Sequence, residues 1–145
     1  MEFVFDDGGR SQYFKGENVG DCVTRAIAIA TEQDYKEVYD ELTVRKKAYY
    51  VKRPKEARGC KTARWGVPRQ VIREYMKDIG WEWVPTMHIG SGCKVHVKKD
   101  ELPSGRIVLN LSRHLSCSID GVLHDTYDCS RDETRCVYGY WKKGA

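Results

Sequence analysis

The sequence lacks several features that would place it in a common functional class. It contains no apolar run long enough to cross a bilayer, and its first residues lack the basic and then apolar pattern of a secretory signal. It also lacks a glycine-rich loop with the spacing of a nucleotide site, an internal repeat and a low-complexity segment. We therefore expect a cytoplasmic protein that uses no nucleotide or organic cofactor and does not bind a membrane.

The composition that is present is typical of one globular domain. The chain has 145 residues, of which 41% are hydrophobic and 11% aromatic. A chain of this size buries enough surface to fold without a disulfide or a metal ion. We expect residues 1–145 to form a single domain. Because no export signal is visible, we expect the six cysteines to be free thiols in a reducing compartment.

Hydrophobic spacing changes part-way along the chain. Apolar residues recur at helical spacing in residues 21–30, from residue 35 onward and in residues 67–79. Asp21 is a predicted N-cap, Pro68 fits a first helical turn and Gly80 fits a C-terminal cap. Pro54 and Gly59 interrupt the second pattern, so residues 49–65 are predicted to form a long loop.

After residue 80 the spacing becomes that of strands. The predicted strands cover residues 81–84, 95–97, 107–111, 114–119, 122–127 and 135–141. Helices followed by antiparallel strands predict an α+β architecture, with helices packed on a C-terminal antiparallel sheet.

Cys22 is predicted to begin the first helix, directly after Asp21. First-turn amides have no helical partner, and the positive end of the helix dipole lies beside them. A thiolate is stabilised in that position, and the thiolate is the nucleophilic form. Arg25 adds positive charge one turn later, and the Cys22 amide is free to donate to an oxyanion.

A predicted hairpin places a histidine and an acid on one face. Asp120-Gly121 between two alternating runs predicts a two-residue turn, which pairs Ile119 with Val122 and Ser116 with Asp125. In that register His114 is opposite Tyr127, and His114 and Asp125 are diagonal neighbours on the same face. A carboxylate that holds one imidazole nitrogen leaves the other free to act as a base. Nucleophile, base and orienting carboxylate are thus all present.

The segments NVGDCVTRA, residues 18–26, and HLSCSIDGVLHDTYD, residues 114–128, carry a resemblance to a known group. Their residue types and order resemble the papain-like cysteine peptidase superfamily, especially its compact bacterial and phage-type members. The resemblance implies a papain-like fold whose central helix starts at the cysteine. It also implies cleavage of a peptide or isopeptide bond through an acyl-enzyme, with Cys22 as nucleophile, His114 as base and Asp125 as orienter. Thioester cleavage and acyl transfer to an amine suit the same residues.

Two residues are candidates to complete an oxyanion hole. Members of the superfamily usually place a glutamine a few residues before the cysteine, whereas this chain has Asn18 four residues before Cys22. Gln12 lies further away and is the second candidate. Asn18 is also suited to capping the turn before the helix. The papain signature around the cysteine is absent, so a non-catalytic member of the superfamily is an alternative.

A basic stretch suggests an anionic partner. Residues 45–64 contain nine basic residues and one acid, whereas the whole chain has a net charge of only +4. Such a local field attracts anions, and nearby aromatic residues can serve nucleic-acid bases. We expect this stretch to bind an acidic protein substrate or, as an alternative function, nucleic acid. The expected anion-binding residues are Arg45, Lys46, Lys47, Lys52, Arg53 and Lys55.

A zinc site is a weaker hypothesis. His88, Cys93 and His96 lie close together in a glycine-rich segment, but no Cys-x-x-Cys pair accompanies them. Cys129 and Cys136 would contribute only if the fold brought them near. We therefore predict no metal site.

Overall fold

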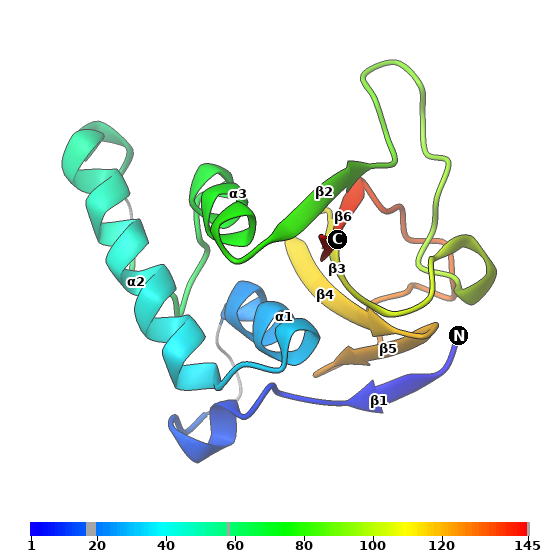
Figure 1. Cartoon of the computed structure of the whole chain (residues 1–145), viewed down its shortest axis with the longest axis horizontal. Coiled ribbons are helices and arrows are strands. Elements are labelled where there is room, and N and C mark those ends of the chain that lie inside the picture. Colours follow the sequence, from blue (N-terminus) through cyan, green and yellow to red (C-terminus); the bar gives the residue numbers. More distant parts are fainter. Residues whose placement is uncertain (17–19, 58, 145) are drawn as a thin grey trace.

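Helix α1, Cys22–Thr31, lies at the centre of the molecule. The computed structural model describes residues 1–16, 20–57 and 59–144. Every residue of α1 from Val23 to Ala30 is buried, because α2 and α3 cover one side of this helix and the sheet covers the other (Figure 1). The alanine-rich sequence of α1 allows this close packing from several directions. The prediction of a helix over residues 21–30 is confirmed.

Two more helices complete the helical layer, α2 (Tyr35–Lys52) and α3 (Arg69–Asp78). Asp34 caps α2 by accepting a hydrogen bond from the Glu37 amide at 3.2 Å. Gly80 adopts a positive φ of 85° after α3, as its predicted capping role requires. The predicted loop over residues 49–65 is wrong in its first part, because α2 continues to Lys52.

The sheet has six strands in the order β1-β5-β4-β3-β6-β2. Their bounds are β1 Phe3–Phe5, β2 Trp81–Pro85, β3 Arg106–Leu111, β4 His114–Ile119, β5 Val122–Asp125 and β6 Gly139–Lys143. The sheet is mixed, because β1 pairs with β5 in parallel while the other pairs are antiparallel. The prediction of a wholly antiparallel, C-terminal sheet is corrected by β1, which comes from the first residues of the chain, where no strand was predicted. The α+β class is confirmed.

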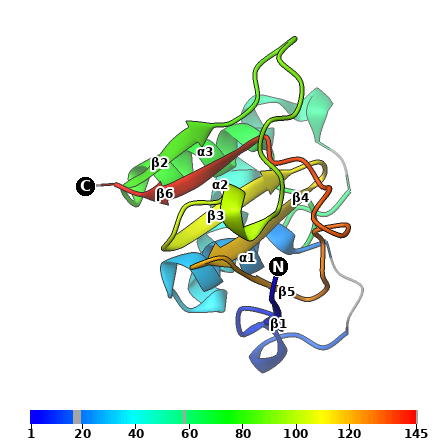
Figure 2. The same cartoon turned by 90° about the vertical axis from the view of Figure 1, so that its right-hand side faces the viewer.

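Both faces of the sheet are covered. On one face Val108, Leu115 and Trp141 pack against the helices. On the other face Ile107, Leu109 and Leu123 pack under Val97 and Val137, which come from long connections. Burial on both faces explains the nearly continuous apolar sequence of β3. Those connections cross the sheet on the side away from the helices (Figure 2). The last predicted strand begins later than expected, since residues 135–138 do not belong to β6.

None of the helices in the described residues is both long enough and apolar enough to cross a membrane.

Candidate active site

The hairpin of β4 and β5 has the predicted register. Ile119 pairs with Val122, and Cys117 pairs with His124. Asp120 and Gly121 have positive φ values of 49° and 79°, which suit a two-residue hairpin turn. β5 ends at Asp125, so Tyr127 is not paired on a strand with His114, but their ring centroids are 5.3 Å apart.

The hairpin brings His114 and Asp125 into direct contact. His114 Nε2 is 2.7 Å from Asp125 Oδ2, and both side chains are buried, with exposed fractions of 7% and 3%. Asp125 also accepts a 2.6 Å hydrogen bond from the Ser116 hydroxyl and a 2.7 Å bond from the Thr126 amide. Burial favours the neutral acid, but His114, Ser116 and the Thr126 amide together hold the pKa of Asp125 below its usual value. The carboxylate is therefore ionised and fixed.

Cys22 completes the cluster from the start of α1. Its half-buried thiol lines the same cleft as His114 and Leu115. Burial raises the pKa of Cys22, but His114, the Leu115 amide and the more distant Arg25 lower it below the usual value. The site therefore favours a thiolate at Cys22.

The imidazole is correspondingly held in its charged form. Burial lowers the pKa of His114, but hydrogen bonds with Asp125, Cys129 and Cys22, together with the charge on Asp125, raise it to about 11. A lowered cysteine pKa and a raised histidine pKa describe a thiolate and imidazolium pair. Such a pair can attack an acyl carbon with the sulfur and then protonate the leaving group from the imidazole.

Arg25 links the cysteine helix to the orienting acid, a role that goes beyond the expected addition of positive charge. Its guanidinium forms an ion pair with Asp21 and lies 3.6 Å from an oxygen of Asp125. Asp21 is fully buried and also accepts a hydrogen bond from the Tyr35 hydroxyl. Asp21 therefore stands at the N-cap position, but its side chain does not cap the helix. The prediction of a carboxylate cap is wrong because two stronger donors occupy that carboxylate.

Beside Cys22 and His114 lies a cleft of about 350 Å³. Its wall includes apolar side chains of Val67, Ile72 and Leu111, together with two arginines, Arg69 and Arg113. Arg113 has a left-handed φ of 54° in the short turn between β3 and β4. A non-glycine residue in that conformation is uncommon, and such residues cluster at functional sites. The cleft thus offers apolar surface and positive charge next to the sulfur.

The basic stretch supports one wall of this cleft. The Lys46 side chain is buried, and its ammonium donates to the carbonyls of Thr62 and Trp65 at 2.9 and 3.0 Å. The ring of Trp65 lies so close to Gly20 that a Cβ there would be 2.5 Å from it. Gly66, the next residue, lines the cleft. Lys46 therefore holds the loop of residues 62–65 beside the start of α1. Because it is buried, its ammonium is not accessible to an anionic partner, contrary to its expected role.

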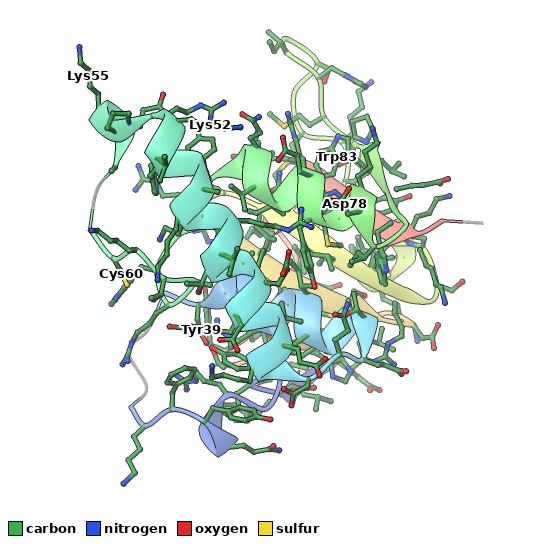
Figure 3. The ribbon with its side chains drawn as sticks, turned by 60° about the vertical axis from the view of Figure 1, so that its left-hand side comes forward. Tyr39, Lys52, Lys55, Cys60, Asp78 and Trp83 are labelled. Atoms are coloured by element: carbon green, nitrogen blue, oxygen red, sulfur yellow. A yellow bond between two sulfur atoms is a disulfide. The ribbon has the colours of Figure 1, made fainter. Side chains whose placement is uncertain are left out.

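The other expected anion-binding residues are on α2 and the loop that follows it. Arg45 forms ion pairs with Glu41 and Asp78, both at 2.8 Å. The Arg53 guanidinium lies 4.2 Å from the centroid of the Tyr49 ring. Lys47, Lys52 and Lys55 are exposed, and Figure 3 shows Lys52 and Lys55 at the far end of α2 with Cys60 on the returning loop. The structure brings none of these three lysines into the wall of the cleft at Cys22.

In the part of the chain that the structure describes, neither of the two residues predicted to complete an oxyanion hole is seen at the cleft. Asn18 lies outside the described residues. Gln12 is exposed in a short 3-10 helix, Arg10–Gln12, and does not line the cleft. The first α-helical hydrogen bond runs from the Arg25 amide to the Asp21 carbonyl at 3.0 Å. The Cys22 amide precedes that bond, so it stays a candidate donor.

One set of possible metal ligands overlaps this site. Donor atoms of His114, Asp125 and Cys129 lie within 4.8 Å of one another. Asp125, however, already accepts from His114, Ser116 and Thr126, and the Arg25 guanidinium beside it repels a cation. The donor set therefore fits a fixed carboxylate better than a metal ion.

Two supports of the site were not predicted from the sequence, the Ser116 hydroxyl at the Asp125 carboxylate and the anchoring ammonium of Lys46. The predicted hairpin placed Ser116 on the face of His114, so a local signal for this support was present. The contact of Lys46 joins the helix to a loop that is more distant in the sequence.

The chain has no significant match among protein-family models, curated proteins or solved structures.

Proposed function

We propose that the protein is a papain-like cysteine hydrolase that cleaves a peptide or isopeptide bond. The observation that carries this proposal is that the Cys22 thiol and the His114 imidazole line one cleft, while His114 Nε2 lies 2.7 Å from the buried Asp125 carboxylate. Cys22 attacks the acyl carbon, and His114 gives its proton to the leaving amine. Water, deprotonated by His114, then releases the acyl group from the sulfur. Asp125 holds the imidazole in place, and a cytoplasmic location is part of the proposal.

The cleft supports an acidic peptide or protein as substrate. Arg69 and Arg113 are positioned to pair with carboxylates, while the apolar wall suits a neighbouring hydrophobic side chain. In this proposal the preference for anions lies at the cleft, rather than at the exposed Lys47, Lys52 and Lys55. An amine in place of water would give acyl transfer by the same steps.

A non-catalytic module that binds an anionic partner is the second candidate function. A hollow of about 580 Å³ at the end of α2 is lined in part by Lys47, Lys61, Tyr50 and Pro54. Positive charge beside an aromatic ring suits a nucleic acid or another anion. This candidate predicts binding that weakens steeply with salt and is independent of Cys22.

The test is the pH profile of alkylation at each cysteine, resolved by mass spectrometry, in the parent and in His114→Gln. An unperturbed thiol has a pKa of about 8.5. We expect Cys22 to react at least about tenfold faster at pH 6 in the parent than in His114→Gln. Cys60 is the matched control, because Thr62 rather than a histidine lowers its pKa. Its profile should be the same in both proteins.

Turnover of acidic peptide substrates provides the second readout. Cys22→Ala should abolish it, while Cys60→Ala should leave it unchanged. Equal reactivity of Cys22 in the parent and in His114→Gln would end the catalytic proposal and favour the binding module.

A further inference from the structure

Cys93 and Cys136 form a second cluster that the proposed hydrolase does not use. They are joined by a disulfide bond, with their Cα atoms 5.9 Å apart. This pairing corrects the expectation that all six cysteines are free. The backbone holds the two segments together independently of the sulfurs, through hydrogen bonds from Val137 to Val95 at 2.8 Å and from Val97 to Arg135 at 2.9 Å. The cluster should therefore persist when the disulfide is reduced.

A histidine lies against this pair. His96 pairs with Cys136 in an isolated antiparallel bridge, and its Nε2 is 3.6 Å from Cys93 Sγ. Its other ring nitrogen, Nδ1, is 3.1 Å from Glu101 Oε1. A carboxylate in that position fixes the ring and leaves Nε2 free to bind a metal, as is common in zinc sites. Met87 covers a further side, with its sulfur 3.7 Å from Cys136 Sγ.

We propose that, after reduction of the Cys93–Cys136 bond, Cys93, Cys136 and His96 bind a zinc ion. Zinc bonds of about 2.3 Å to sulfur and about 2.0 Å to nitrogen place tetrahedral ligand atoms roughly 3.5–3.8 Å apart. The imidazole is already at that distance from Cys93, and the two sulfurs have to separate to reach it. The fourth position is open to water.

The electron and proton balance requires a two-electron reductant, and a dithiol is the reductant that we propose. The reductant supplies two electrons and two protons, leaves as its own disulfide, and produces two protein thiols. Zinc then replaces both thiol protons, which are released to solvent, and neutral His96 contributes its lone pair. Cys93 is exposed and His96 is 34% exposed, so the reductant and the ion both have access. The same three residues thus alternate between a disulfide and a zinc site.

The test is a metal titration of the full chain with Co²⁺ as a spectroscopic probe, followed by competition with Zn²⁺. One sample is first reduced with a phosphine, which is then removed without oxygen, and the other is kept oxidised. We expect one equivalent of tetrahedral, thiolate-bound Co²⁺ in the reduced protein and none in the oxidised protein. Glu101→Gln should lower the affinity about 10–100-fold. His96→Ala should lower it at least as much, whereas His88→Ala, on the exposed part of the same connection, should not change it.

Two further variants locate the metal. Cys136→Ser should abolish the thiolate absorption, and Cys129→Ser should preserve it. Binding that survives Cys136→Ser but is lost in Cys129→Ser would place the metal on the cluster with His114 and overturn the proposal. Absence of binding at micromolar metal in the reduced parent would overturn it as well. Neither result depends on Cys22 or on hydrolysis.

Discussion

Two regions of this molecule combine cysteine, histidine and a carboxylate, but they differ in burial. In the first, His114 is 7% exposed and lies 2.7 Å from Asp125, which has further buried donors around it. In the second, His96 is 34% exposed and lies 3.1 Å from Glu101. Charges interact more strongly where water is excluded. The same residue types thus form a tightly paired, charged cluster where they are buried and a more accessible cluster near the surface.

The two regions should differ most in how much the loss of their carboxylate destabilises the folded protein. Asp125→Ala leaves the buried His114 and Arg25 without their shared partner, and should lower the free energy of unfolding by about 3–5 kcal/mol. Glu101→Ala removes a partly exposed pair and should cost less than about 1 kcal/mol. Urea unfolding of both variants measures the two losses. Equal losses would remove the distinction between a buried and an accessible cluster.

Reduction of the Cys93–Cys136 bond should cause the next largest loss in the free energy of unfolding. Its cysteines are 43 residues apart, and opening a loop of that length costs about 2–4 kcal/mol of stability. Unfolding with and without a phosphine gives this loss, and the double variant Cys93→Ser with Cys136→Ser is the control that should not respond. Zinc at about 100 times its Kd should restore about 2.7 kcal/mol to the reduced parent. No recovery would argue against alternation between disulfide and zinc site.

The pH dependence of stability gives the smallest of the three effects. The pKa of His114 in the folded state is about 11, above its unfolded value near 6.5, so its contribution is complete below about pH 6.5 and is lost as pH rises through 11. The pKa of Asp125 is lowered, so its contribution is present above about pH 4 and is lost as pH falls.

The measurement is the difference in unfolding free energy between the parent and His114→Gln across pH. We expect that difference to be greatest between about pH 4 and pH 6.5 and to decrease by more than about 1.4 kcal/mol at high pH. A difference that does not change with pH would show that the imidazole carries no stabilising charge.

Local signals in the sequence were sufficient for much of the fold. The start of α1 at Cys22, the Gly80 cap and the register of the β4–β5 hairpin were all predicted from spacing and turn residues. The parallel pairing of β1 with β5 was not, because it joins the first residues to a strand more than a hundred residues later. The end of α2 was placed too early, since Pro54 and Gly59 predict a loop from residue 49, whereas the helix continues to Lys52. The burial of Lys46 was not foreseen either, because the Thr62 and Trp65 carbonyls meet its ammonium only in the folded chain.

The face that His114 and Asp125 share follows from the sequence alone, because a strand has a period of two and a two-residue turn fixes the register. The start of a helix at Cys22 follows from local signals as well. The position of the Cys22 thiol beside His114, and the meeting of Cys93 and Cys136 beside His96, depend on the tertiary structure. Those contacts are made between elements distant in the chain, and they follow from packing in three dimensions rather than from any local spacing.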